Sequence, residues 1–252
     1  MNAGFSGQLS VKLDGRPPQR SGGYTLITEL DLREALSMNL ILLGAQGSGK
    51  GTQSALLAQR FDLEPCASGD LLREAMAQGT PAGQQARPYY ERGDLVPDEL
   101  MVGMILERLK NLTDAHGIIL DGFPRNHVQA DVLDARLAEM GQAIARVIYL
   151  EVPRALLLER LSGRYICRAQ GHVYNIKTNP PKTPGICDID GSELYQRSDD
   201  TGEKILHRLD IFFSETLQLT DYYARQGKLV TVDGTQSIAD VNYAILVNLG
   251  AA

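Results

Sequence analysis

A glycine-rich stretch follows the apolar segment 40–43 and is the part of the sequence best suited to chemistry. It reads Gly-Ala-Gln-Gly-Ser-Gly-Lys-Gly-Thr over residues 44–52. Glycines let the backbone turn sharply, so successive N–H groups can point at one anion, and a helix that begins there adds its dipole. Lys50 supplies positive charge for phosphate oxygens, and the Thr52 hydroxyl can reach a phosphate or its Mg²⁺. The pattern predicts a phosphate-binding loop, with Gly51 inserted between the lysine and the hydroxyl that usually follows it directly.

Further motifs stand in the order that is typical of the nucleoside monophosphate kinases, and of the adenylate kinases in particular. They are Ser-Gly-Asp-Leu-Leu-Arg at 68–73, Asp-Gly-Phe-Pro-Arg at 121–125, Arg-Leu-Ser-Gly-Arg at 160–164, Asn-Pro-Pro-Lys at 179–182, Arg-Ser-Asp-Asp at 197–200 and Asp-Gly-Thr at 233–235. The chain resembles this family from Met38 to about Gly250, and Met38 resembles its usual start. The resemblance implies reversible, Mg²⁺-dependent phosphoryl transfer from ATP to AMP, giving two ADP and maintaining adenine nucleotide balance.

The resemblance also implies how the cations are used. A nucleoside triphosphate and a monophosphate together carry roughly six negative charges, so they repel each other unless cations surround them. Guanidinium groups suit this task because each binds two phosphate oxygens and stays charged. By resemblance, Arg73 and Arg125 hold the phosphate of AMP, Arg160 and Arg164 hold the triphosphate, and Arg197 and Arg208 stabilise the transferring group between them. The expected catalytic residues are Lys50, Asp121, Arg125, Arg160, Arg164, Arg197 and Arg208.

Asp121 ends the apolar run 118–120 and resembles a carboxylate that lies beside a phosphate loop. We expect it to hold Mg²⁺ through water, because Mg²⁺ keeps much of its hydration when it binds to proteins. The motifs contain no evident general base. None is required, since the accepting phosphate oxygen is already anionic.

Choice of the acceptor base rests on Gln129 and Ser68. The amide of Gln129 matches the donor and acceptor edge of adenine, and Ser68 keeps a hydroxyl where the adenylate kinases usually have Thr. The resemblance implies that AMP contacts Ser68, Arg73, Asp94, Leu95, Val96, Gly122, Phe123, Pro124, Arg125, Gln129, Arg197 and Arg208. It implies that ATP contacts Gly47, Ser48, Gly49, Lys50, Gly51, Thr52, Arg160, Arg164, Val173, Tyr174 and Gln236, the last three near its adenine.

A metal site in the segment 163–200 stays open at this point. Some long-lid adenylate kinases carry zinc on Cys-x-x-Cys and Cys-x-x-Cys or Cys-x-x-Asp motifs. The matching positions here are Cys167, Gln170, Cys187 and Asp190. Three of these could ligate zinc, whereas glutamine is a poor ligand, and His172 offers a substitute in an unusual register. The alternative is a lid held by hydrogen bonds without metal.

Other functions remain to be separated from this one. The uridylate and cytidylate kinases resemble the chain in the same motifs, but they usually have Ala at the position of Ser68, lack Gln129 and have a shorter lid. A kinase that uses GTP is a further alternative. A nucleotide-binding protein without catalysis would be favoured by the loss of Lys50 or of the bridging arginines, all of which are present.

The elements that must hold these residues follow from the hydrophobic pattern. The apolar runs 40–43, 118–120, 147–150 and 229–232 are short and apolar on both faces, which is typical of strands buried in a parallel sheet. Helical patterns lie between them, including 100–109 and one long helix from about residue 200 to just before 227. We therefore predict an α/β fold of the P-loop NTPase type, a parallel sheet flanked by helices.

Two segments interrupt the alternation, so a core domain would be formed by 38–66, 97–162 and 201–252. Segment 67–96 has short helical patterns and is expected to be an NMP-binding insertion. Segment 163–200 is rich in Gly, Pro and Asn and is expected to be a small β lid. Residues 1–37 lack a sustained period and the features of a targeting peptide, so we expect a disordered leader or extension.

Composition is typical of an ordinary globular protein and not of a disordered one. The 252 residues include 25 Lys+Arg and 31 Asp+Glu, for a formal charge of −6. This acidic balance argues against a general nucleic-acid binder, and no apolar run has the roughly 20 residues of a membrane helix. Three cysteines with no export signal favour a reducing, cytoplasmic compartment. The family resemblance adds the expectation of a monomer whose partners are ATP, AMP and ADP.

Overall fold

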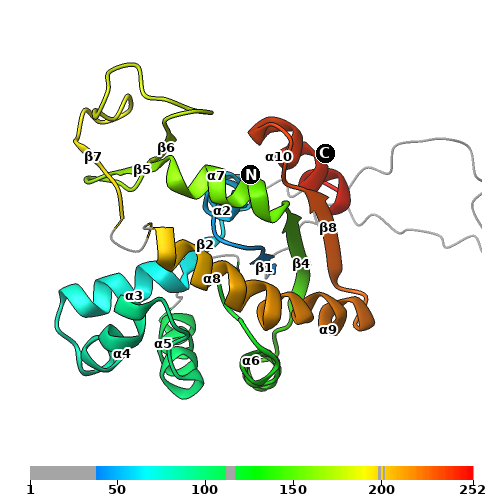
Figure 1. Ribbon diagram of the computed structural model, residues 1–252. Coiled ribbons are helices and arrows are strands. Elements are labelled where there is room, and N and C mark those ends of the chain that lie inside the picture. Colours follow the sequence, from blue (N-terminus) through cyan, green and yellow to red (C-terminus); the bar gives the residue numbers. More distant parts are fainter. Residues whose placement is uncertain (1–37, 112–116, 198–199, 201, 252) are drawn as a thin grey trace, which may run out of the picture. The chain divides into compact units, whose positions relative to one another are not determined.

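A computed structural model describes residues 38–111, 117–197, 200 and 202–251. Its centre is a sheet of parallel strands in the order β2-β3-β1-β4-β8 (Figure 1). These strands are β1 (Asn39–Leu43), β2 (Glu64–Ala67), β3 (Ile118–Asp121), β4 (Ile144–Glu151) and β8 (Leu229–Asp233). The α/β class and the parallel sheet flanked by helices are thereby confirmed. The expectation for residues 1–37 lies outside the described part of the chain.

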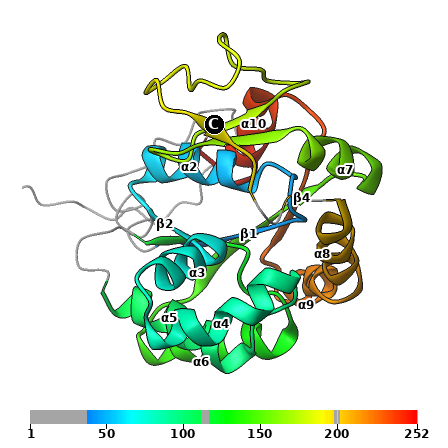
Figure 2. The ribbon, with the colours of Figure 1, turned by 60° about the vertical axis from the view of Figure 1, so that its left-hand side comes forward.

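Helices cover both faces of this sheet, because side chains alternate between the faces along each strand. From β1, Leu40 and Leu42 pack with α2 (Lys50–Phe61) and α10 (Ile238–Asn248), whereas Ile41 and Leu43 point to the opposite face. Figure 2 shows α2 and α10 on one side of the sheet and α5, α6, α8 and α9 on the other. The opposite face is covered by α5 (Asp98–Lys110), α6 (His127–Glu139), α7 (Arg154–Ser162), α8 (Gly202–Ser214) and α9 (Leu219–Arg225).

The strand order places a crossover at β1. Its neighbours are β3 on one side and β4 on the other, so the connections after β1 and β3 leave the sheet in different directions. Ligands of open α/β sheets bind outside the carboxyl ends of the strands at such a switch point. Residues 44–49 follow β1 at this edge, and Asp121 ends the neighbouring strand β3.

Two elements differ from the expectations. Strand β2 was not predicted, because Glu-Pro-Cys-Ala contains no apolar run; it lies at the edge of the sheet, where a proline is tolerated. The predicted long helix is broken: α8 ends at Ser214, a 3-10 turn follows at Thr216–Gln218, and α9 ends at Arg225. Asp200, near which that helix was expected to begin, directs its carboxylate to Arg164.

Segment 67–96 contains α3 (Ser68–Ala77) and α4 (Pro81–Arg92), which pack closely against each other. Gly83 of α4 makes this possible, since a Cβ built on it would lie 2.2 Å from the backbone of Ala75 in α3. Thr80 caps α4 by accepting a hydrogen bond from the N–H of Gly83 at 3.1 Å. The two helices therefore form one tight pair beside the sheet edge.

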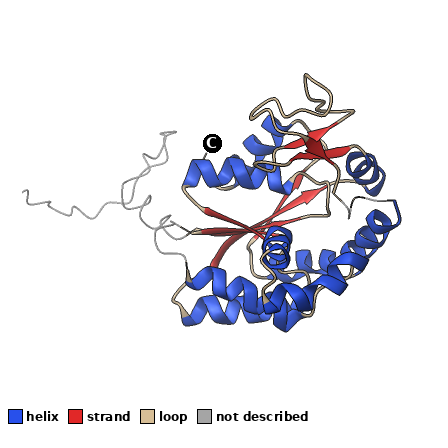
Figure 3. Cartoon of the chain, turned by 90° about the vertical axis from the view of Figure 1, so that its left-hand side faces the viewer, coloured by secondary structure: helices blue, strands red, loops and turns tan. Residues whose placement is uncertain are grey.

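Segment 163–200 forms a small antiparallel sheet in the order β6-β5-β7, separate from the central sheet (Figure 3). Its strands are β5 (Arg164–Cys167), β6 (Val173–Asn175) and β7 (Leu194–Tyr195). Cys167, Tyr174, Cys187 and Leu194 form its own buried cluster. Within the described ranges of the chain, no helix combines the length and apolar character needed to cross a bilayer.

Candidate active site

The glycine-rich loop turns tightly between β1 and α2. Gly44, Gly47 and Gly49 all have positive φ, and a Cβ on Gly44 would lie 2.6 Å from the Ser48 hydroxyl. Residues with side chains rarely adopt this backbone conformation. Ser48 Oγ is buried without a hydrogen-bond partner, so the loop holds a polar atom that a phosphate oxygen would satisfy. The expected phosphate-binding residues Gly47–Thr52 all belong to this turn and the start of α2.

Lys50 begins α2 and is almost fully buried. Its Nζ donates to the carbonyl of Ala45 at 3.0 Å and lies 3.8 Å from Asp121 Oδ1. Burial lowers the pKa of Lys50; Asp121 opposes this effect, while Arg125, Arg164 and Arg208 add to it by repulsion. Lys50 therefore lies among like charges, and an anionic ligand would reduce their repulsion.

Arg160, in the last turn of α7, joins two loops at the sheet edge. Its NH1 donates to the carbonyl of Gly234 at 2.9 Å and lies 3.5 Å from the carbonyl of Gly47. Burial lowers its pKa. The residues after β8 therefore lie beside the phosphate loop, where Gln236 is exposed and donates to Asp233 at 3.3 Å.

Arg164 opens β5 and binds a buried carboxylate. Its Nε and NH2 donate to the two oxygens of Asp200 at 2.7 and 2.5 Å, and Arg208 NH1 lies 3.9 Å from the same carboxylate. The side chain of Asp200 is 0% exposed. Sequence reasoning assigned no role to Asp200, although it stands at the end of a motif. Arg197 is partly buried next to residues outside the described ranges.

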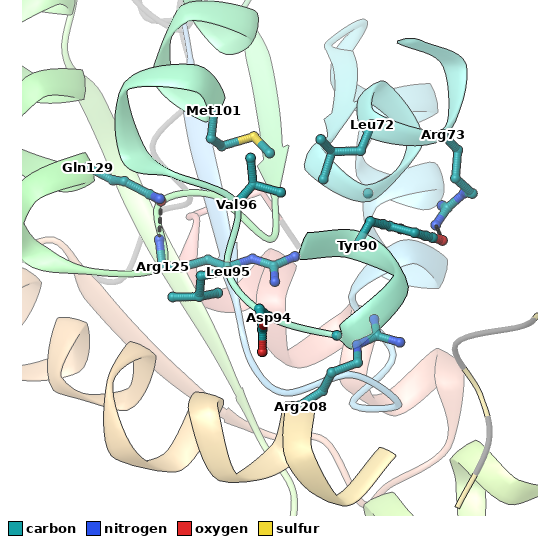
Figure 4. Close-up of a pocket in the computed structure, with 12 residues that line it drawn as sticks. Leu72, Arg73, Tyr90, Asp94, Leu95, Val96, Met101, Arg125, Gln129 and Arg208 are labelled. Atoms are coloured by element: carbon teal, nitrogen blue, oxygen red, sulfur yellow. Dashed lines mark hydrogen bonds between the residues drawn. The ribbon is translucent and has the colours of Figure 1, made fainter. Parts of the chain in front are cut away.

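A pocket between α3, α4, α5 and α6 brings together most of the residues expected around AMP (Figure 4). Its lining includes Arg73, Asp94, Leu95, Val96, Arg125, Gln129 and Arg208. Tyr90 and Met101, which the sequence did not single out, also line it. The phenol of Tyr90 accepts from Arg73 NH1 at 3.2 Å, and Arg73 also pairs with Asp70. Arg197 is not among the lining residues.

Arg125 lies at the base of this pocket. Its Nε donates to the carbonyl of Gly122 at 2.8 Å, and Ser68 Oγ donates to the same carbonyl at 2.8 Å. Burial, and repulsion by Arg208, lower the pKa of Arg125. Phe123 and Pro124 are buried beneath it. The guanidinium groups of Arg125 and Arg208 therefore lie close enough to repel each other, and both line the pocket.

Asp94 links the pocket to α8. Its carboxylate lies 2.8 Å from His207 Nε2 and accepts from Arg92 Nε at 2.7 Å. These contacts, with that to His207 the largest, lower the pKa of Asp94. His207 directly precedes Arg208, so the contact fixes this part of α8 beside the loop 93–96. No feature of the sequence indicates this pairing.

Two of the residues expected near the adenine of ATP, Val173 and Tyr174, lie in the small β segment. Val173 is exposed, with 46% of its surface accessible. Tyr174 points inward instead: its hydroxyl lies 3.4 Å from Cys187 Sγ and accepts from the N–H of Asp188 at 2.8 Å. Its ring is therefore packed inside the small β segment rather than exposed to a ligand.

A cluster of four potential metal ligands lies in the same segment: Cys167, His172, Cys187 and Asp190. His172 Nδ1 lies 3.4 Å from each sulfur and 3.2 Å from Asp190 Oδ2, and Cys167 Sγ lies 3.2 Å from that oxygen. Gln170 is exposed and contributes its backbone N–H to Cys167 Sγ at 3.3 Å. The fourth place in the cluster is thus taken by His172, two residues beyond the position that the spacing suggested.

Comparisons with known proteins agree with this geometry. Residues 42–228 match the family model described as adenylate kinase. The adenylate kinase of Carboxydothermus hydrogenoformans is 47% identical over 204 residues, which cover 81% of this chain and 95% of that protein. The adenylate kinase of Bacillus subtilis is 46% identical with 81% and 94% covered, and that of Streptomyces griseus is 43% identical with 85% and 99% covered.

Proposed function

The chain belongs to the adenylate kinase family and is a phosphotransferase, and from this membership we propose how its own residues carry out the reaction ATP + AMP = 2 ADP. The phosphate loop with Lys50 holds the triphosphate, and the pocket of Figure 4 holds AMP. Arg125 and Arg208 bind the phosphate groups that meet between them. The observation that carries this assignment is the place of the buried Lys50 after the tight glycine turn, where Ser48 Oγ has no hydrogen-bond partner and Arg125, Arg164 and Arg208 lie close enough to repel its ammonium group.

The chemistry follows from charge and position. Transfer of a phosphoryl group needs two substrates in line and neutralisation of their charge, with little covalent chemistry from the protein. Buried guanidinium groups do this well because a cation acts more strongly when water is excluded. Asp200 holds Arg164 and Arg208 in place before the phosphates arrive. We assign Arg197 to the transferring group by resemblance alone.

The family's reaction uses Mg²⁺ with ATP, and the residues of this chain fit that ion. Asp121 offers an oxygen donor at the end of β3, 3.8 Å from Lys50 Nζ and next to the phosphate loop. Mg²⁺ prefers oxygen ligands and keeps several waters. When bound, it would neutralise charge on the triphosphate. Asp121 would then orient its hydration shell.

We further propose that segments 67–96 and 163–200 are the NMP-binding and lid domains, and that the lid holds zinc. A tetrahedral zinc ion with bonds of about 2.0–2.3 Å separates its ligand atoms by roughly 3.3–3.8 Å. Four of the six distances among the ligand atoms of Cys167, His172, Cys187 and Asp190 are 3.2–3.4 Å, close to those edges, and all six are within 4.8 Å. The backbone N–H of Gln170 would support the thiolate of Cys167.

A cytoplasmic monomer is the expected setting. Cys66, Cys167 and Cys187 are free and buried, which agrees with a reducing compartment. Light scattering after gel filtration tests the oligomeric state of the full chain, with twice the chain mass as the contrary result.

The function is tested by initial rates of ADP formation with ATP, Mg²⁺ and one acceptor at a time. We expect AMP to be the best acceptor among AMP, CMP, UMP and GMP, because the pocket presents Gln129 and Ser68. Without an acceptor, ATP hydrolysis should be far slower, since the two inserted segments are expected to exclude water. Equal rates with and without AMP would contradict the proposal, and a preference for CMP or UMP would reassign the substrate.

A further inference from the structure

Gln129 does not stand alone at the base of the AMP pocket; its amide is fixed by two neighbours. Its Oε1 accepts from the backbone N–H of Arg125 at 2.8 Å, a contact drawn in Figure 4. Its Nε2 donates to Oδ1 of Asp98, the first residue of α5, at 2.7 Å. The side chain of Gln129 is buried, with 1% exposed. Both ends of the amide therefore have a defined partner inside the protein.

Each partner can play only one role. A backbone N–H donates and cannot accept, and a carboxylate accepts and cannot donate. If the amide of Gln129 turned over, its oxygen would face the carboxylate of Asp98 and its NH₂ would face the N–H of Arg125. Both contacts would become repulsive in a buried place, where unpaired polar groups are costly. The orientation of the amide is thus set by the protein before any ligand binds.

Asn126 holds Asp98 in the same way. Its Nδ2 donates to Asp98 Oδ1 at 2.9 Å, while its Oδ1 caps α6 by accepting from the N–H of Gln129 at 2.9 Å. The side chains of Asp98, Asn126 and Gln129, together with the backbone N–H of Gln129, therefore form a closed ring of hydrogen bonds between α5 and α6. Every donor and acceptor in this ring has a single consistent direction.

We propose that Asp98 determines base specificity as a positioning residue, by locking the amide of Gln129 in the orientation that reads adenine. The inference rests on the proposed function, in which Gln129 contacts the base of AMP. The remaining lone pair of Oε1 then accepts from the exocyclic amino group, and the second N–H of Nε2 donates to the adjacent ring nitrogen. Hypoxanthine and guanine carry an oxygen at the place of that amino group, so the locked amide opposes them.

The test compares AMP with IMP as acceptors, because the two nucleotides have nearly the same shape and differ in the group that Gln129 would read. In Asp98→Asn, the amide that replaces the carboxylate can donate as well as accept, so one of the two contacts that hold Gln129 no longer excludes the turned amide and the barrier to turning over is lowered. The ratio of kcat/KM for AMP to that for IMP should fall roughly tenfold, the effect of one misdirected bidentate contact. The KM for AMP should rise, and the KM for ATP should stay unchanged.

Two controls separate specificity from general damage. Glu99→Gln removes a charge from the same first turn of α5, where the exposed side chain has no role in the ring; it should leave the ratio unchanged. CMP provides the second control, since cytosine presents the same donor and acceptor order as adenine. Asp98→Asn should therefore raise the relative rate with IMP and not with CMP. Asp98→Glu, which keeps an acceptor, should restore part of the preference.

The outcomes distinguish a failure of this inference from a failure of the proposed function, in which Gln129 contacts the base of AMP. If Gln129→Leu changes neither the KM for AMP nor the ratio, Gln129 does not read the base. If Gln129→Leu lowers the ratio while Asp98→Asn does not, the base contact stands and the role of Asp98 is overturned. An equal fall in Glu99→Gln would also overturn it. Should Asp98→Asn fail to fold by circular dichroism, Asp98→Ser gives the same comparison, because a hydroxyl accepts or donates.

Discussion

The guanidinium of Arg164 meets the carboxylate of Asp200 at two points, from Nε at 2.7 Å and from NH2 at 2.5 Å. Asp200 has no exposed side-chain surface, and Arg208 lies 3.9 Å from the same carboxylate. A buried carboxylate therefore serves as the counter-ion of two arginines that are expected to bind phosphate. Phosphate groups that enter the site will compete with it.

Replacing Asp200 by Asn should destabilise the free protein and harm the liganded protein much less. Loss of one partner leaves buried cations uncompensated, which costs roughly 3–5 kcal/mol, whereas a bisubstrate mimic would supply replacement anions. Urea unfolding with and without the mimic measures both values. Asp210→Asn is the control, since its exposed pair with Arg154 is worth about 0–1 kcal/mol. An equal loss of unfolding free energy with and without the mimic would contradict this account.

Lys50→Met should abolish most turnover while the protein remains folded. Removing one preorganised cation that faces developing charge costs about 10²–10³ in rate, and Met fills a similar volume. Coupled measurement of ADP formation gives the rate, and circular dichroism checks the fold. A variant with normal kcat would show that Lys50 does not contact the transferred group.

Lys50 also predicts a pH dependence of stability. Burial lowers its pKa in the folded state below the ordinary value of 10.5. Between the lowered pKa and 10.5 the unfolded chain binds the proton that the folded chain has released, so the free energy of unfolding should rise with pH in this window. Lys50→Met lacks this contribution. The difference between the two proteins should therefore grow in favour of the wild type as pH approaches 10.5; a difference that shrinks would contradict the sign.

Gly83 should not tolerate a side chain. A Cβ there would lie 2.2 Å from the backbone of Ala75, so Gly83→Ala must push α3 and α4 apart, at a cost of roughly 1–3 kcal/mol or more. The matched control is Gly103→Ala in α5, where no atom lies within 4 Å of the added Cβ. That change should stabilise the protein by about 0.5–1 kcal/mol. The Tm of both variants, measured by thermal unfolding, checks this prediction. Changes in Tm of the same sign in Gly83→Ala and Gly103→Ala would contradict the close packing of α3 and α4.

Metal analysis tests the lid cluster. The purified full chain should contain close to one zinc per molecule, and a strong chelator should lower its Tm, because a ligand of the folded state stabilises that state. His172→Ala should lose most of the metal, whereas Gln170→Ala should keep it, since only the backbone of Gln170 touches Cys167. If His172→Ala keeps the metal and Gln170→Ala loses it, the fourth ligand is at position 170, as the sequence spacing suggested. A zinc content near zero per molecule of the wild-type protein would rule out the proposed zinc site.

The sequence predicted what depends on local pattern. Four strands could be found because each is a short apolar run, and the phosphate loop because its glycines serve one local geometry. Strand β2 escaped notice, since its membership in the sheet depends on pairing with β3 rather than on its own residues. The break between α8 and α9 at Glu215 also lacks a local signal such as Gly or Pro.

Side-chain partners were harder to predict than elements. Nothing in the spacing shows that Asp98 reaches Gln129, because the two residues lie on different helices. The same holds for Asp200 with Arg164, which are brought together only when the chain returns from the lid. His172 reaches the cysteine cluster because a turn at Gly171 redirects the chain. Long-range packing decides such contacts.

The chain passes between the central sheet and the small β segment twice. Arg160 and Arg164 lie on the outward crossing, and Arg197 and Arg208 lie on the return. A polyanion bound by guanidinium groups from both crossings would link the two crossings to each other. The hydrogen bonds that hold the ligand would then also limit movement of the small β segment relative to the central sheet. Sulfate or orthophosphate at high concentration would form the same link without any nucleotide. The choice of buffer salt would then set the resting separation of the two crossings.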